Sequence, residues 1–251
     1  MNTLWVFGDS FASDKNHWYY YNNQGDEWKC PDWFWPNQLA NKLNCNLKLT
    51  ALPGVSNEWI SHQVRTKLNN QHFQQNDFIV IVTTQPDRRW LMPQHPSLAN
   101  IYINNLDKYL TRRQYKAINL YKEEFLEQHQ FLSQIYYEQF LTWIHSVLKP
   151  YRYCLLPGFD STRLHHVCNE WSMVNAEEAE FVKGADDKDM VEKIWAGADK
   201  RLCHFSKNNH AVLSDKIVKF FYKNELIDFS TVFSQNLFTC DKDLVDYTIE
   251  S

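Results

Sequence analysis

The chain has 251 residues, of which 44% are hydrophobic and 22% are charged, and its formal net charge is -4. No run of lysine and arginine is long enough to bind a polyanion, so nucleic acid is not an expected partner. The six glycines stand singly, which excludes a P-loop and a glycine-rich dinucleotide-binding fold. The length indicates one sizeable domain covering residues 1–251.

The cysteines and the N-terminus indicate the compartment. The six cysteines include no CxxC pair, so we expect reduced thiols and neither a zinc ribbon nor a thioredoxin-type motif. Residues 4–7 form an apolar run that is too short for a signal peptide or a membrane span. We therefore expect a cytoplasmic protein without a membrane partner.

The first third of the chain predicts two strands and two helices. Residues 3–8 are a short β-prone run that stops at a glycine, which is typical of a buried parallel strand ending in a sharp turn. Residues 14–35 are polar and aromatic without a period, so we expect a long loop there. A helix is then predicted over 36–43, a strand over 46–52 and a second helix over 57–68.

The rest of the chain continues the alternation of strands and helices. The uninterrupted β-branched run at 77–83 predicts a strand with both faces covered, and residues 86–112 look like an irregular insertion. Residues 121–148 predict one long helix with its apolar stripe in the core, and a fourth strand follows over 151–156. Ser206 is placed to cap a last helix. This order predicts an α/β fold with a central, mostly parallel sheet.

The ends of the first three expected strands carry the candidate chemistry. In parallel α/β sheets, active sites lie beyond the carboxyl ends of the strands. The first strand delivers Ser10, behind an Asp9 that we expect to brace the turn, the second delivers Gly54 and the third delivers Thr84. A serine becomes a nucleophile only when a base takes its proton, and that base is usually a histidine oriented by a carboxylate. The segment 199–210 contains residues of both types.

These features together resemble a known family. An N-terminal strand ending in Gly-Asp-Ser, a glycine after the second strand, and a C-terminal loop with an acid and two histidines six residues apart are similar to the SGNH, or GDSL-type, hydrolases. The resemblance spans nearly the whole chain through few specific residues. It implies a flavodoxin-like three-layer sandwich and the hydrolysis of esters, especially of acyl groups on carbohydrates or lipids.

The resemblance also implies roles for individual residues. Ser10 corresponds to the nucleophile, His204 to the base and Asp199 to the acid of a catalytic triad. The backbone N–H groups of Ser10 and Gly54, with the hydroxyl of Thr84, correspond to the oxyanion hole. The chemistry requires no cofactor, and the histidines lack an HExxH pattern, so no metal is expected.

Two departures from the family pattern leave alternatives open. Arg201 stands where the family has aspartate, so the acid is Asp199 or one of the aspartates at 186, 187 and 189. The third block reads Val82-Thr83-Thr84-Gln85 in place of Gly-x-Asn-Asp, so the amide of Gln85 or Asn57 is an alternative donor to Thr84. Losing one oxyanion donor typically slows an enzyme about 100- to 1000-fold.

The predicted function is a serine esterase that cleaves an O-acyl ester, most plausibly on a carbohydrate, through an acyl-enzyme on Ser10. Asn57, Gln85, Trp18 and Trp33 are candidate substrate-binding residues, although the two tryptophans equally fit a self-packed loop. His210 is expected to pack at the first turn of the last helix and is the alternative base.

Two other functions fit the same residues. The acyl group could pass to a sugar hydroxyl, which would make the protein an acyltransferase, or the chain could be a carbohydrate-binding protein that kept the fold and lost activity. Its departures from the family resemble those of divergent SGNH-like proteins encoded by tailed phages. In that case the expected substrate is a host surface polysaccharide or a small intracellular metabolite, and association with the virion is an alternative to the cytoplasm.

Overall fold

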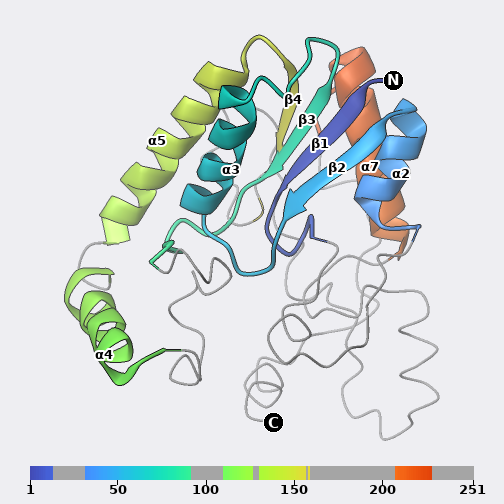
Figure 1. Cartoon of the computed structure of the whole chain (residues 1–251). Helices are drawn as coiled ribbons and strands as arrows, with labels where there is room; N and C mark the ends of the chain where they lie inside the picture. The colour runs from blue at the N-terminus through green and yellow to red at the C-terminus, as the bar shows by residue number, and fades with distance from the viewer. Residues whose placement is uncertain (14–31, 92–109, 127–129, 157, 159–206, 228–251) are drawn as a thin grey trace, which may run out of the picture.

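The structure is a computed structural model that describes residues 1–13, 32–91, 110–126, 130–156, 158 and 207–227. Within these residues the centre of the molecule is a four-stranded sheet, and every strand pair in it is parallel. The strands lie in the order β2-β1-β3-β4 (Figure 1). Their bounds are β1 (Thr3–Gly8), β2 (Asn46–Ala51), β3 (Phe78–Val82) and β4 (Arg152–Leu156).

The predicted strands are confirmed, each to within a residue at either end. All five residues of β3 are buried, as its β-branched run predicts for a central strand covered on both faces. β1 is equally buried from Leu4 onward and lies between β2 and β3, with Phe7 beside both Thr50 and Ile81. Because the strands are parallel and in this register, their carboxyl ends meet at one edge of the sheet.

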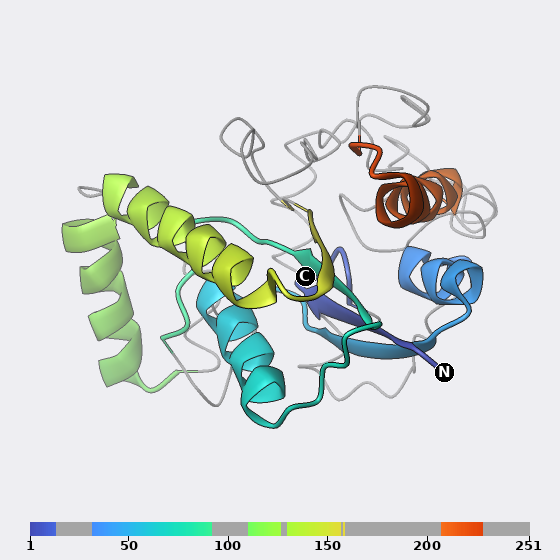
Figure 2. The ribbon, with the colours of Figure 1, turned by 90° about the horizontal axis from the view of Figure 1, so that it is seen from above.

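Helices cover both faces of the sheet and make three layers (Figure 2). On one face lie α2 (Trp35–Leu43) and α7 (Lys207–Lys223), and on the other lie α3 (Asn57–Asn69) and α5 (Gln130–Leu148). Alternate strand residues point to opposite faces, so Leu4 and Val6 join the core under α2 and α7. Trp5 and Phe7 join the core under α3 and α5. The predicted α/β fold is therefore confirmed.

The helical region before β4 corrects two predictions. The expected single helix over 121–148 is instead α4 (Arg112–Tyr121), a π-helical turn η3 (Lys122–Leu126) and α5. Helix α4 begins earlier because Thr111 and Gln114 form a capping box: the Thr111 hydroxyl accepts the N–H of Gln114, and the Gln114 side chain accepts the N–H of Thr111. The apolar stripe is also not all core, since Ile135 is 41% exposed. No helix in the described part of the chain is long and apolar enough to cross a membrane.

Candidate active site at the carboxyl edge of the sheet

The turn after β1 holds Ser10 at the edge of the sheet. The Asp9 carbonyl accepts the N–H groups of Ala12 (3.1 Å) and Ser13 (2.9 Å), and the Asp9 carboxylate accepts the N–H of Phe11 (3.1 Å). Asp9 is fully buried and braces this turn as predicted, while Ser10 is partly exposed. The neighbouring carboxylate thus fixes the backbone on which Ser10 stands.

Glycine is required immediately before this turn. A Cβ on Gly8 would lie 2.8 Å from the Cβ of Val82, closer than side chains approach one another. The absence of a side chain therefore lets β1 and β3 lie close together where the turn begins. This contact brings the end of β3 beside the Asp9-Ser10 turn.

The end of β2 contributes a glycine turn and a helix cap. Gly54 has a φ of 72°, in the left-handed region that other residues rarely adopt. Two residues later the Ser56 hydroxyl accepts the N–H of Trp59 at 3.3 Å and caps α3. The turn and the cap fix how the backbone passes from β2 into α3 beside the Ser10 turn.

Asn57 joins the ends of β2 and β3. Its amide oxygen accepts the N–H of Thr84, and its amide nitrogen donates to the Thr84 carbonyl, both at 2.9 Å. Both residues are buried. Asn57 is predicted to bind substrate, but in the structure its amide has a structural use: it joins the end of the third strand to the first turn of α3.

The buried cation Arg88 completes a cluster at the strand ends, the strand-end cluster, which consists of Asp9, Ser10, Asn57, Thr84, Gln85 and Arg88. Arg88 Nη1 donates to Asp9 Oδ2 at 3.2 Å and to the Thr84 hydroxyl at 2.7 Å, while its Nε donates to Gln85 Oε1 at 3.2 Å. Burial lowers the pKa of the Arg88 guanidinium below its ordinary value, and the carboxylates of Asp9 and Asp87 oppose that shift. Asp9, Thr84 and Gln85 are thus held together by one guanidinium.

The first turn of α7 is anchored at the same edge. Trp35 donates its backbone N–H to His210 Nδ1 (3.3 Å) and its indole N–H to the Phe11 carbonyl (2.7 Å). The His210 ring packs against two aromatic rings, and its centroid lies 5.3 Å from that of Trp33 and 5.0 Å from that of Phe34. His210 therefore has the packing role predicted for it, and Trp33 contacts His210.

The remaining predicted site residues lie outside the described part of the chain. These are His204 and Asp199, the three upstream aspartates, Trp18, and Ser206 as the expected cap of α7. The bulk of the aromatic loop, residues 14–31, and most of the expected insertion, residues 92–109, also fall there. Among the described residues no three histidine, cysteine, aspartate or glutamate side chains are grouped to hold a metal ion.

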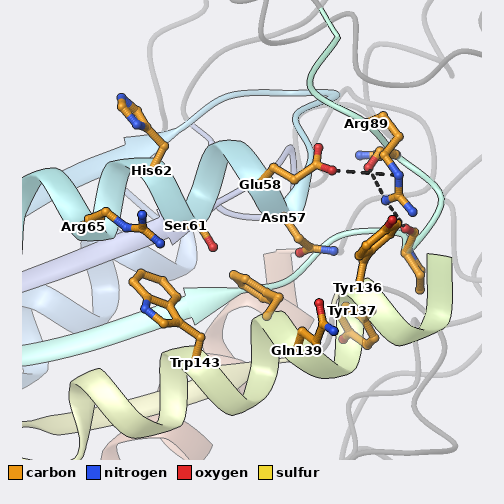
Figure 3. Close-up of a pocket in the computed structure, with 13 residues that line it drawn as sticks. Asn57, Glu58, Ser61, His62, Arg65, Arg89, Tyr136, Tyr137, Gln139 and Trp143 are labelled. Carbon is orange, nitrogen blue, oxygen red and sulfur yellow. Dashed lines mark hydrogen bonds and ion pairs between the residues drawn. The ribbon is translucent and has the colours of Figure 1, made fainter. Parts of the chain in front are cut away.

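A cavity of about 400 Å³ opens beside this cluster, between α3 and α5 (Figure 3). Asn57 and Arg88 belong to both the cluster and the cavity wall, so the two are continuous. The lining consists of residues from α3, the loop after β3 and α5: Asn57, Glu58, Ser61, His62, Arg65, Pro86, Arg88, Arg89, Tyr136, Tyr137, Gln139, Phe140 and Trp143.

Residues 86–91, the described start of the expected irregular insertion, contain no helix or strand, and charged side chains hold them in place. Glu58 Oε2 accepts the N–H of Trp90 at 2.6 Å, and Glu58 Oε1 lies 3.8 Å from Arg89 Nε. Arg89 also donates to the Ser133 hydroxyl at 3.0 Å and so joins the loop to α5.

Sequence reasoning missed Arg88, Arg89 and Glu58. One signal was available: a buried carboxylate directly after a strand requires a cation, and the Arg88-Arg89 pair follows the third strand end. No model of a known protein family matches the chain, and no curated protein gives a significant match. The chemistry of the site therefore has to be argued from its own residues.

Proposed function

We propose that the protein is an ester hydrolase of the SGNH type that works through an acyl-enzyme on Ser10. The observation that carries the proposal is the joining of three strand ends. Asn57 binds the backbone of Thr84 through two hydrogen bonds of 2.9 Å, and Arg88 bridges Thr84 to Asp9, next to Ser10. The three expected elements, a serine, a glycine turn and a hydroxyl, therefore belong to one braced edge of the sheet.

The topology supports the same proposal. The strand order β2-β1-β3-β4 agrees with a flavodoxin-like sheet over its described strands. In such sheets ligands bind where the strand order reverses, which here is beside β1 and β3. Asp9 and Ser10 follow β1, and Thr84 and Arg88 follow β3, so these residues correspond in position to the ligand sites of flavodoxin-like sheets.

The hydrogen bond from Arg88 favours an oxyanion-binding role for Thr84. A hydroxyl has one proton to donate and two lone pairs that accept. Because the Thr84 oxygen accepts from Arg88 Nη1 at 2.7 Å, its own proton is left for another acceptor. Thr84 is buried, so a substrate oxygen has to enter the edge of the sheet to accept that proton. The nearby guanidinium also favours a developing negative charge. Thr84 would then act together with the backbone N–H groups of Ser10 and Gly54.

The reaction follows the chemistry of an activated serine. His204, oriented by Asp199, takes the Ser10 proton as the oxygen attacks the ester carbonyl, and the donors hold the tetrahedral oxyanion. Collapse breaks the bond to the alcohol, which leaves with the proton from His204 and gives an acyl-enzyme on Ser10. Water, deprotonated by His204, then attacks the acyl group. As the bond to the Ser10 oxygen breaks, His204 returns that proton to Ser10, which releases a carboxylic acid and free enzyme. The segment that carries His204 precedes α7, whose first turn is anchored at this edge through His210 and Trp35.

Turnover of p-nitrophenyl acetate tests the proposal. Replacing Ser10 with alanine should lower kcat/KM by at least about a thousandfold, because loss of the nucleophile removes the acyl-enzyme route. Ser146→Ala is the matched control, since Ser146 is an exposed serine on α5, and it should leave turnover unchanged. Equal turnover by Ser10→Ala and wild-type protein would reject Ser10 as the nucleophile.

A further inference from the structure

The cavity between α3 and α5 has two chemically different walls. The α5 wall is aromatic: Tyr137 and Phe140 are buried and stacked, with ring centroids 6.3 Å apart, and Tyr136 and Trp143 flank them. The α3 wall is polar, with hydroxyl and charged side chains. Figure 3 shows Trp143 reaching from α5 toward Arg65 of α3. A volume of about 400 Å³ lies within the range of sites for small molecules.

The charges on the wall are unbalanced. Three arginines and one glutamate line the cavity. Arg88 pairs with Asp9 at 3.2 Å, and Arg89 lies 3.8 Å from Glu58, so each of these two has an acidic neighbour. Arg65 has no ion-pair partner among the residues that the structure describes, and its guanidinium carbon lies 5.0 Å from the centre of the Trp143 ring.

Stacking on an aromatic ring leaves an arginine able to bind an anion. The contact uses the flat face of the guanidinium, and its N–H groups point outward in the guanidinium plane. That planar fork matches the two oxygens of a carboxylate or a phosphate. Arg65 thus offers a positive charge and several donors at the rim of a cavity whose opposite wall is aromatic.

We propose that this cavity binds an anionic sugar, with the aromatic wall of α5 contacting the sugar ring and Arg65 binding a carboxylate or phosphate group on it. The inference rests on the proposed function, because the sugar is the part of the ester substrate that places the acyl group near Ser10. Apolar faces of sugar rings pack on aromatic side chains, and Ser61 and Gln139 are polar lining residues suited to sugar hydroxyls. The wall shared through Asn57 and Arg88 connects the sugar site to the strand-end cluster.

Isothermal titration calorimetry on the full chain carrying Ser10→Ala tests the inference without turnover. The probes are methyl β-D-glucuronide, glucose 6-phosphate and the neutral methyl β-D-glucoside. We expect at least one anionic sugar to bind at least tenfold more tightly than the glucoside, and the anion that does so identifies the group. Arg65→Ala should remove this preference, and added salt should weaken it because the charge is exposed.

Arg113→Ala is the matched control, since Arg113 is an exposed arginine on α4 outside the cavity, and it should retain the preference. Arg65→Gln, which keeps most of the side-chain length, replaces the alanine variant if that variant fails to fold. Equal affinity for all three sugars, binding by none of them, or a preference that survives both Arg65 variants would overturn the inference. The turnover of p-nitrophenyl acetate is measured in parallel on proteins that retain Ser10. This ester has no sugar, so its turnover tests only the reaction at Ser10 and separates the proposed esterase activity from the proposed sugar site.

Discussion

The buried ion pair between Asp9 and Arg88 gives the sharpest prediction about stability. Replacing Asp9 with asparagine keeps the shape of the side chain and removes its charge. Asp9 is 0% exposed and the Arg88 side chain is 10% exposed, so water does little to compensate the guanidinium that loses its partner. Breaking such a buried pair typically costs about 3–5 kcal/mol, which is a large part of the roughly 5–15 kcal/mol that stabilises a domain.

The reverse substitution, Arg88→Met, should cost a similar free energy because it removes the cation that faces the buried Asp9 carboxylate. The double variant Asp9→Asn/Arg88→Met contains neither charge. It should therefore be no less stable than either single variant, which corresponds to a coupling free energy of about 3–5 kcal/mol. The two hydrogen bonds that Arg88 makes to Gln85 and Thr84 are lost in both Arg88→Met and the double variant, so they do not enter this coupling.

Urea unfolding followed by tryptophan fluorescence measures all four proteins at neutral pH. A cost below about 1 kcal/mol for Asp9→Asn would refute the argument, because it would mean that the charge pair is solvated or dispensable. Simple addition of the two single costs in the double variant would refute it equally, since the two charges would then be energetically independent.

Three further predictions concern neighbouring parts of the structure. Asn57→Ala leaves the buried N–H and carbonyl of Thr84 without their side-chain partner, so the free energy of unfolding measured in urea should fall by about 2–6 kcal/mol. A fall of less than about 1 kcal/mol would contradict the stabilising role of the two Asn57–Thr84 hydrogen bonds. Gly54→Ala places an alanine at a backbone φ of 72°, in the left-handed region, and should lower the free energy of unfolding by about 1–2 kcal/mol. It should also slow the turnover of p-nitrophenyl acetate. Unchanged stability would show that the turn can change its backbone conformation without cost. Burial and then the charge of Asp77 raise the pKa of the Cys45 thiol above its ordinary 9.0, so folded protein holds less thiolate than unfolded protein near that pH. The rate of alkylation of Cys45 by iodoacetamide, followed by peptide mass spectrometry across a pH series, should therefore reach half its maximum at a higher pH in folded than in urea-unfolded protein, whereas equal midpoints would disprove the shift.

Much of the sheet is predictable from the sequence because its strands are buried on both faces. The run Phe78–Val82 is apolar at every position, which only a covered central strand permits, and each strand end carries a glycine or polar residues that stop it. Since parallel strands share one carboxyl edge, the residues after them had to converge. The meeting of the Asp9, Gly54 and Thr84 segments is therefore a consequence of local patterns.

The partners of those residues depend on tertiary packing and were missed for that reason. Arg88 and Asp9 are 79 residues apart in the chain, so the sequence indicates that Asp9 needs a cation but not which of the chain's cations supplies it. The cavity wall likewise arises from α3 packing beside α5, which places Arg65 over Trp143. Helix α4 is different, because the sequence alone contains the capping-box pattern that begins it, Thr111 followed three residues later by Gln114.

Labelling with a fluorophosphonate tests the central claim most directly, because this probe forms a phosphonate ester only with an activated serine and releases fluoride. We expect one adduct per chain, located by fragmentation of the tryptic peptide 1–15 to Ser10 rather than to the buried Ser13. The adduct should be absent from Ser10→Ala and retained in Ser146→Ala. Folded wild-type protein that gains no adduct, or gains it on a serine other than Ser10, would contradict the claim that Ser10 is the nucleophile of an ester hydrolase.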